Sequence, residues 1–256
     1  MIFKWSLKLQ KTIKAARKVS HTGGWPGEIK FQRMINEAAW KDLIEELNNK
    51  ATLVAVSKTK PPADIRQLYE LGQRDFGENY VQELAEKQPQ LPADIRWHFI
   101  GHLQRNKVKY IAPFVHLIHA VDSFELLKEI NKQASKNNRT IDVLLQLHIA
   151  EEATKHGLDE NKMLELLQYY EAQKDSLQQV RITGLMGMAT FTDQEAQIRQ
   201  EFERLHNFFL YLKDTVFIRD AAFTNLSMGM SSDYKIALAC GSNLVRVGSL
   251  LFGARG

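Results

Sequence analysis

Lys58 ends a β-rich apolar run, 52–58, and is the residue best placed for covalent chemistry. In an extended strand, Val54, Val56 and Lys58 project to the same side. If that side is a buried interior, the low dielectric lowers the pKa of a lysine, and a neutral amine attacks aldehydes. Lys60 is a rival amine beyond the strand. Position alone leaves open the alternative that Lys58 simply extends its ammonium group into water.

Serines, glycines and an arginine near the end of the chain predict an anion site. Ser227 follows one predicted strand, and Ser231 is expected to cap the helix that begins there. Backbone N–H groups at a helix start attract phosphate. The last strand contains Arg246 and leads into Gly248, where the missing side chain lets the backbone approach a ligand closely. Each could be an ordinary turn residue, but their joint placement favours a phosphate site.

The histidines and the cysteine do not predict a metal site. His98 and His102 are four residues apart, but a predicted turn separates them. His116 and His119 are three apart on a predicted strand and therefore point to opposite sides. Cys240 is the only cysteine, so an internal disulfide is impossible. We expect its thiol to pack on an apolar helix face.

Eight strand patterns, most of them separated by helical patterns, must position these residues. They lie at 52–58, 74–79, 96–101, 116–123, 141–149, 180–189, 223–229 and 244–253. Strands separated by helices pair in parallel, and eight such units close into a single α/β (β/α)8 barrel of the TIM type. The loops after strands one, seven and eight then meet at one mouth of the barrel. A predicted helix at 34–49 completes the outer ring, because no full helix follows strand eight.

The basic residues are concentrated in the first 33 residues. This segment holds eight lysines and arginines against one acid, a net charge of +7, so the remainder carries −3 of the total of +4. We interpret 1–33 as a poorly ordered basic extension, in preference to a targeting segment. The domain proper is then 34–256. Its slightly acidic balance does not favour nucleic acid, and no stretch is apolar enough to span a membrane.

Seven sequence blocks, taken in order, carry a family resemblance. They are AVSKTKP (55–61), FGENYVQE (76–83), WHFIGHLQ (97–104), HG (156–157), GLMG (184–187), LSMGMS (226–231), and VRVGS (245–249) with FG (252–253). Together they resemble the YggS/PROSC family of pyridoxal phosphate homeostasis proteins. The blocks extend over almost the whole domain. The basic front is not part of the usual shape of that family.

The resemblance implies pyridoxal 5′-phosphate (PLP) as the cofactor, held covalently as a Schiff base on Lys58. It also implies roles for residues in the other blocks. Asn79 borders the cofactor ring, and Met186 packs on or near the ring. The residues expected around the phosphate or the ring edge are Ser227, Ser231, Arg246 and Gly248.

The function implied is the carriage or buffering of PLP without catalytic turnover. The alternative is a PLP-dependent amino-acid racemase, because the barrel resembles the N-terminal domain of alanine racemases. A racemase needs acid and base groups on both faces of its substrate. Lys58 could serve one face, but the tyrosine for the other comes from a second domain, and this chain stops after strand eight. Nothing in the sequence places Tyr80 or Tyr234 opposite Lys58.

The expected partners follow from this interpretation. We expect PLP as ligand, PLP-dependent apo-enzymes as recipients of the cofactor, and neither nucleic acid nor a membrane. We also expect a monomer in the cytoplasm, since a single cysteine is typical of a reducing compartment.

Overall fold

A computed structural model describes residues 35–152 and 156–253 of the chain. The basic segment 1–33, with the prediction that it is poorly ordered, lies outside the described residues.

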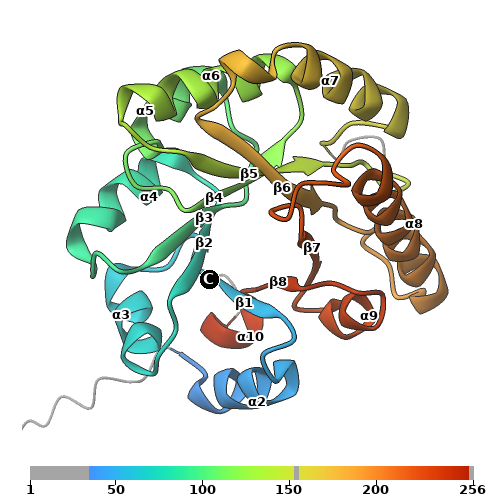
Figure 1. Ribbon diagram of the computed structural model, residues 1–256. Coiled ribbons are helices and arrows are strands. Elements are labelled where there is room, and N and C mark those ends of the chain that lie inside the picture. The colour runs from blue at the N-terminus through green and yellow to red at the C-terminus, as the bar shows by residue number, and fades with distance from the viewer. Residues whose placement is uncertain (1–34, 153–155, 254–256) are drawn as a thin grey trace, which may run out of the picture. The chain divides into compact units, whose positions relative to one another are not determined.

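Eight parallel strands close into a barrel in sequence order, with β1 hydrogen-bonded to both β2 and β8 (Figure 1). The strands are β1 (Thr52–Val56), β2 (Asp75–Glu78), β3 (Arg96–Phe99), β4 (Leu117–Val121), β5 (Ile141–Gln146), β6 (Val180–Met186), β7 (Asn225–Met230) and β8 (Leu244–Val247). Each begins within two residues of its predicted start. The predicted (β/α)8 barrel is therefore confirmed.

Helices connect the strands and form the outer ring. They are α2 (Glu37–Leu47), α3 (Pro62–Glu70), α4 (Val81–Lys87), α5 (Val108–Ile111), α6 (Phe124–Lys136), α7 (Glu160–Ala172), α8 (Glu195–Thr215), α9 (Tyr234–Ala239) and α10 (Ser249–Phe252). Three short 3-10 turns accompany them, at Gln88–Gln90, Arg105–Lys107 and Lys174–Ser176. Side-chain caps fix several starts: the Ser123 hydroxyl accepts from the Leu126 amide at 3.3 Å, as the sequence predicts.

The helix ahead of the first strand completes the ring, as predicted. Figure 1 shows α2 between α3 and α9. Its Leu43 and Leu47 are buried, and Tyr234 of α9 donates to the Glu46 carboxylate of α2 at 2.8 Å. The predicted strand at 244–253 is too long, because the chain leaves the extended conformation at Gly248 and forms α10. That turn buries Leu251 and Phe252, which a straight strand would carry away from the barrel.

Two apolar cores result from the alternation of side chains along the strands. One set of strand residues faces the helices and joins the larger core. The opposite set fills the barrel interior and consists of Val54, Leu117, Ala120, Leu144, Met186 and Leu244. The interior also encloses polar side chains, which lie above and below this small apolar layer.

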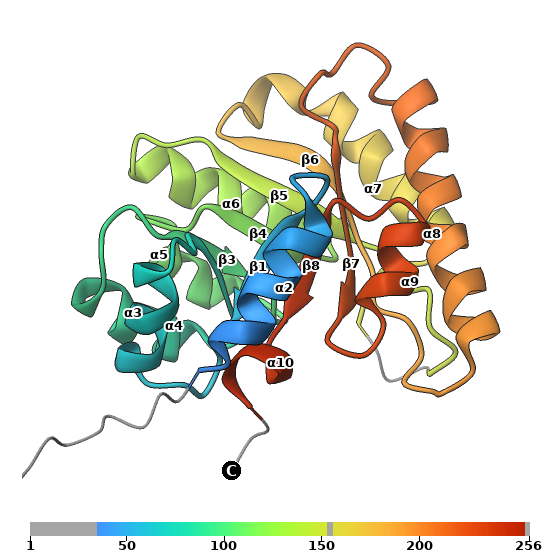
Figure 2. The ribbon, with the colours of Figure 1, turned by 90° about the horizontal axis from the view of Figure 1, so that it is seen from below.

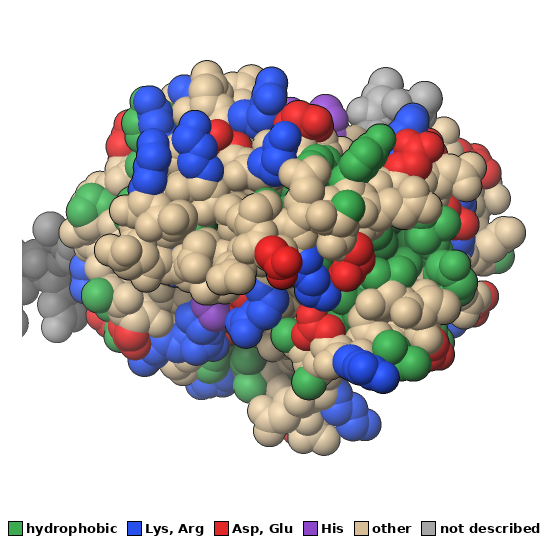
Figure 3. Space-filling view, turned by 45° about the horizontal axis from the view of Figure 1, so that its top comes forward, with side chains coloured by type: hydrophobic (Ala, Val, Ile, Leu, Met, Phe, Trp, Pro, Cys, Tyr) green, Lys and Arg blue, Asp and Glu red, His purple; other side chains and the backbone are tan. Residues whose placement is uncertain are grey.

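The strands point toward the side of the barrel that carries α10, as the arrowheads of β7 and β8 show in Figure 2. The face in Figure 3 carries charges of both signs, with lysine and arginine side chains gathered at its upper left. None of the helices in the described part of the chain has the length and apolar character needed to cross a membrane.

Candidate functional site

A cavity of about 560 Å³ opens at the carboxyl ends of the strands, the side on which barrel enzymes place their functional groups. Its walls come from the segments that follow β1, β2, β3, β6, β7 and β8. The described residues that line it are Val56, Lys58, Lys60, Asn79, Ile100, Met188, Phe191, Met230, Ser231, Ser232, Arg246, Gly248, Ser249, Phe252 and Gly253. Five of the seven predicted cofactor residues are in this set: Lys58, Asn79, Ser231, Arg246 and Gly248.

Lys58 lies in a tight turn directly after β1. The strand ends at Val56, two residues earlier than predicted, but the predicted sidedness holds: Val54 is in the barrel interior, and Val56 and Lys58 line the cavity. The Lys60 amide donates to the Ser57 carbonyl at 3.0 Å and closes the turn. Lys58 is half-buried there and lines the cavity.

The rival amine, Lys60, also lines the cavity, but the structure gives it a different setting. Its Nζ donates to the carbonyl oxygen of Phe252 in α10 at 2.9 Å. Lys60 therefore links the turn after β1 to the last helix. The two lysines thus line the same cavity.

Arg246 supplies a buried cation on β8. Only 4% of its surface is exposed. One guanidinium nitrogen donates to the Ser227 hydroxyl at 2.5 Å, and another donates to the Gly187 carbonyl at 3.0 Å. Burial lowers the pKa of Arg246 to about 10, with Asp233 acting in the opposite direction. The side chain is therefore still a cation at neutral pH and fixes a positive charge in the cavity wall.

A chain of hydrogen bonds runs from Arg246 through the barrel interior to Asp75 at the opposite end. The Ser227 hydroxyl contacts His119 Nδ1 at 3.0 Å, and His119 Nε2 contacts His98 Nδ1 at 2.9 Å. His98 Nε2 then reaches Asp75 at 3.0 Å. We call these five residues the inner chain.

The two ends of the inner chain define its direction, because a guanidinium only donates and a carboxylate only accepts. If Ser227 accepts from Arg246 and donates to His119, every member has a partner when both histidines are neutral and carry hydrogen on Nε2. Burial, with nearby Arg246 and His98 adding to it, lowers the pKa of His119 well below its ordinary value. A neutral His119 agrees with that direction.

Ser231 and Gly248 meet at the rim formed by β7 and β8. The Gly248 amide donates to the Ser231 hydroxyl oxygen at 3.2 Å. The prediction that Ser231 caps the following helix is wrong: α9 begins after Asp233, whose carboxylate accepts from the Met230 amide at 2.5 Å. A Cβ on Gly248 would lie 3.1 Å from the Val56 carbonyl, so glycine keeps this part of the cavity open.

Asn79 follows β2 and lines the cavity next to the turn after β1. Its Oδ1 atom is buried, and no protein group in the described residues donates to it. Gly101 packs against its backbone so closely that a Cβ there would lie 2.4 Å from the Asn79 carbonyl oxygen. This side-chain oxygen is therefore a buried acceptor that a ligand could satisfy.

Two predicted residues lie beneath the cavity rather than on its surface. Met186 is almost fully buried in the interior apolar layer, and Met188, which sequence reasoning missed, lines the cavity above it. Ser227 is fully buried beneath Arg246. Strand alternation was the signal for Met188, because residues two apart share a side. The cavity wall also includes Phe191, whose 87% exposure leaves its ring at the rim.

The inner chain was also missed. His119 is fully buried and His116 is exposed, but the His116 and His119 rings both lie against His98, with centroid distances of 5.4 and 5.2 Å, so the prediction that they point to opposite sides is wrong. The register of β4 shifts between Ile118 and Val121, which interrupts the alternation of side chains. Metal-ligating atoms of Asp75, His98 and His116 lie within 4.8 Å of one another, as do those of His102, Asp122 and His156. The spacing of His98 and His102 did not reveal these groups, because each histidine is grouped with residues of other segments. In the first group, both ring nitrogens of His98 already have protein partners.

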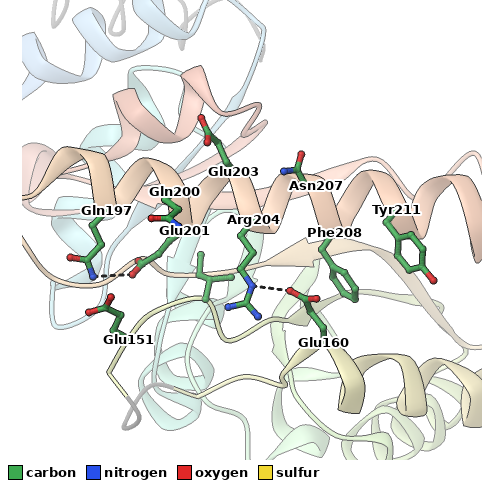
Figure 4. A pocket seen from close by; sticks show the side chains of 11 residues that line it. Glu151, Glu160, Gln197, Gln200, Glu201, Glu203, Arg204, Asn207, Phe208 and Tyr211 are labelled. Atoms are coloured by element: carbon green, nitrogen blue, oxygen red, sulfur yellow. Dashed lines mark hydrogen bonds and ion pairs between the residues drawn. The ribbon is translucent and has the colours of Figure 1, made fainter.

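A second hollow, of about 670 Å³, lies beside α8 (Figure 4). Among the described residues that line it, Glu151, Glu160, Glu201 and Glu203 outnumber the one cation, Arg204. Arg204 itself donates to Glu160 at 2.8 Å. An acidic wall repels phosphate, whereas the cavity at the strand ends contains two lysines and an arginine. Charge therefore favours the cavity at the strand ends over this hollow as a candidate site for an anion.

Comparison with known proteins places the chain in a family. The chain matches the alanine racemase N-terminal domain family over residues 35–256. A pyridoxal phosphate homeostasis protein of Pasteurella multocida is 40% identical over 208 residues, which cover 79% of this chain and 86% of that protein. The PLP-bound structure of PipY from Synechococcus elongatus PCC7942 is 36% identical, with a TM-score of 0.76, and the match covers 87% of this chain and 100% of PipY.

The racemases are more distant. An alanine racemase from Streptomyces coelicolor is 17% identical with a TM-score of 0.67, and the match covers 85% of this chain and 57% of the racemase. At that identity the likeness shows a shared barrel fold.

Proposed function

The chain belongs to the alanine racemase N-terminal domain family, and from that premise we propose that it binds PLP and carries or buffers this cofactor in PLP homeostasis. Two similarities support the proposal: the 40% identical relative is named a pyridoxal phosphate homeostasis protein, and the 36% identical PipY has been solved with PLP bound. The cavity at the strand ends is the proposed binding site.

The cavity has the chemistry that PLP requires. PLP supplies a phosphate and an aldehyde that an amine attacks, on a ring bearing further polar atoms. Lys58, Lys60 and Arg246 give the cavity a positive lining, and serine hydroxyls lie on the β7 and β8 side. The unpartnered Asn79 oxygen offers an acceptor for a ligand. The residues that line the cavity therefore fit the chemical groups of PLP.

We assign covalent attachment, as a Schiff base, to Lys58. Its turn is directed at the cavity, whereas the Lys60 ammonium group donates to the Phe252 carbonyl and ties the turn to α10. Arg246 holds its charge at the wall through Ser227 and Gly187. Ser231 and Gly248 border the phosphate or the ring edge, and Asn79 borders the ring. Met186 and Ser227 support the surface from beneath, and Met188 joins the contact set.

The residues that line the cavity favour a carrier over a racemase. Among its described residues, the titratable side chains are Lys58, Lys60 and Arg246. A racemase removes a proton on one face and returns it on the other, which requires a second acid or base. Neither tyrosine considered above lines the cavity; the Tyr234 hydroxyl donates to Glu46 on the outside of the barrel. The described lining thus favours binding without turnover.

The same proposal places the protein in the cytoplasm as a monomer that hands PLP to apo-enzymes. The single cysteine, Cys240, is buried, and burial raises the pKa of its thiol, which makes it a poor nucleophile. The proposal includes no role for nucleic acid.

The experiment is a transfer assay. Purified protein is loaded with PLP, freed of unbound cofactor, and mixed with the apo form of a PLP-dependent enzyme. We expect one PLP per chain, recovery of the apo-enzyme's activity, and no conversion of L-alanine to D-alanine by the loaded protein alone. Steady, Lys58-dependent formation of a D-amino acid would replace the carrier proposal with the racemase alternative.

A further inference from the structure

The turn that carries Lys58 is held from outside the barrel by an ion cluster. The cluster consists of Glu78 at the end of β2 and of Glu83 and Lys87 on α4. Lys87 Nζ donates to Glu78 at 2.7 Å and to Glu83 at 2.6 Å. Lys87 is 5% exposed and Glu78 is fully buried. We call these three residues the outer ion cluster.

The outer ion cluster bonds to the residue on each side of Lys58. On one side, the Ser57 hydroxyl donates to Glu78 at 2.6 Å, and the Ser57 carbonyl accepts from Lys87 at 2.8 Å. On the other side, the Thr59 amide donates to Glu83 at 2.5 Å. Three hydrogen bonds thus fix the backbone and side chain that flank the reactive lysine, and none uses Lys58 itself.

The conformation held in this way is one that the sequence alone disfavours. Thr59 has φ of 65°, in the left-handed region that β-branched residues rarely adopt. It is the third residue of the Ser57–Lys60 turn, a position that often requires positive φ and is usually glycine or asparagine. Strain of this kind persists only when the surroundings over-determine it, and it is concentrated at functional sites.

The outer ion cluster joins three segments on the helix side of the barrel wall. Ser57 and Glu78 lie on the strand faces that point away from the cavity, toward the helices. Lys87 has three N–H donors and uses all three, on Ser57, Glu78 and Glu83. One ammonium group thereby joins β1, β2 and α4 behind the turn.

We propose that Glu78, Glu83 and Lys87 are positioning residues that aim Lys58 into the cavity by holding Ser57 and Thr59. This inference rests on the proposed function, since it concerns the attachment of PLP to Lys58. None of the three is among the described residues that line the cavity. The cluster acts by orienting the Lys58 amine, and the rate at which an amine attacks a bound aldehyde depends on the orientation of the two groups.

The test compares two glutamates of the same helix. Glu83→Ala removes the acceptor of the Thr59 amide, whereas Glu86→Ala changes an exposed residue three positions away that does not contact the turn. PLP is added to each protein, samples are reduced with borohydride over time, and the lysine modified is identified by peptide mass spectrometry. We expect attachment to Lys58 to slow about tenfold in Glu83→Ala and to stay within about twofold of wild type in Glu86→Ala.

A second readout on the PLP-free protein uses formaldehyde and borohydride, which methylate accessible lysines. A released turn lets the Lys58 side chain leave the half-buried position, so its methylation relative to Lys60 should rise in Glu83→Ala. Glu83→Gln keeps an acceptor oxygen, so both the rate of PLP attachment to Lys58 and its methylation relative to Lys60 should be close to those of wild type. Circular dichroism shows that each variant is folded.

The outcomes separate this proposal from the proposed function. If Glu83→Ala attaches PLP and methylates as wild type does, the positioning role is wrong, whatever PLP does in the wild type. If the wild type attaches no PLP to either lysine, the carrier proposal fails, and the formaldehyde result alone decides whether the outer ion cluster directs Lys58.

Discussion

The inner chain and the outer ion cluster lie on opposite faces of the barrel wall, and each fixes one cationic residue of the cavity. Inside, His98, the neutral His119 and a serine separate the Arg246 guanidinium from the Asp75 carboxylate. Outside, the Lys87 ammonium group touches both glutamates directly. The inner residues are held by directed hydrogen bonds between mostly neutral groups, and the outer residues by buried charges in contact.

This difference has a physical cause. The barrel interior is enclosed by strands on every side, and burial keeps His119 neutral there. Neutral donors and acceptors in series satisfy one another at little desolvation cost. The outer ion cluster joins three separate segments at one point, which a single ammonium group with three donors can do. The two regions should therefore respond differently to mutation and to pH.

The largest effect is expected from breaking the outer ion cluster. Lys87→Met leaves the Glu78 carboxylate buried without its cation, so the free energy of unfolding should fall by about 3–5 kcal/mol in urea titrations. Burial already raises the pKa of Glu78, while Lys87 and Ser57 act against that rise. A carboxyl whose pKa is raised in the folded state destabilises the protein as the pH rises and the carboxyl ionises. The loss of stability in Lys87→Met should therefore grow as the pH rises above 4.5, the ordinary pKa of a glutamate.

The matched variant is the double replacement Glu78→Gln with Lys87→Met, which removes the charge together with its partner. It should be more stable than Lys87→Met alone. If the two single replacements simply add, the buried pair is not coupled and the description of the outer ion cluster is wrong.

A smaller loss is expected inside the barrel. His119→Leu leaves the Ser227 hydroxyl and His98 Nδ1 without partners, and two unsatisfied buried groups cost about 2–4 kcal/mol. Because His119 is neutral, this loss should be the same at pH 6 and pH 9, in contrast to that of Lys87→Met. A loss that changes strongly over this range would show that the inner chain contains a charged histidine.

The sequence predicts the barrel and the Lys58 side of the cavity because both depend on local alternation. Val54, Val56 and Lys58 face the interior whether the strand ends at 56 or 58. The same rule fails for His116 and His119, because the register of β4 shifts between Ile118 and Val121 and both rings lie against His98. Alternation also assigns Glu78 to the helix side, and the Glu83–Lys87 spacing of four is a common helix pair. What local patterns do not contain is that Glu78, Glu83 and Lys87 meet at Ser57 and Thr59.

Long-range geometry explains the other differences. Ser231 looks like a helix cap, but its hydroxyl accepts from Gly248 on the neighbouring strand, a pairing created by the closed barrel. Met186, the last residue of β6, lies beneath the cavity, and Met188, two residues beyond the end of the strand, lines it. The depth of a residue in a barrel depends on strand register, which no single segment specifies.

The far end of the inner chain should show a pH response of its own. Burial alone would raise the pKa of Asp75, but hydrogen bonds from His98 and Arg96 outweigh it and lower the pKa to about 2. A carboxyl whose pKa is lowered in the folded protein stabilises the fold at pH values above its ordinary pKa of 3.8. That stabilisation is lost as the pH falls toward 2. The loss should be roughly 2 kcal/mol in wild type and absent in Asp75→Asn, measured by unfolding between pH 4.5 and pH 2.

The smallest effect is expected at Thr59. Thr59→Gly tolerates φ of 65° and keeps the amide that donates to Glu83. Its free energy of unfolding should change by less than about 1 kcal/mol, because relief of strain offsets the greater freedom of the unfolded glycine. PLP attachment should persist. Thr59→Pro lacks that amide and should lose attachment; if both variants attach PLP normally, the Thr59–Glu83 contact does not matter.

The identity of the lysine that holds PLP tests the central claim most directly. Wild type, Lys58→Ala and Lys60→Ala are each incubated with PLP, reduced with borohydride and digested, and the modified peptide is sequenced by mass spectrometry. Our account predicts the cofactor on Lys58 in wild type and in Lys60→Ala, and none fixed in Lys58→Ala. Cofactor on Lys60 with Lys58 unmodified in the wild-type protein would contradict it.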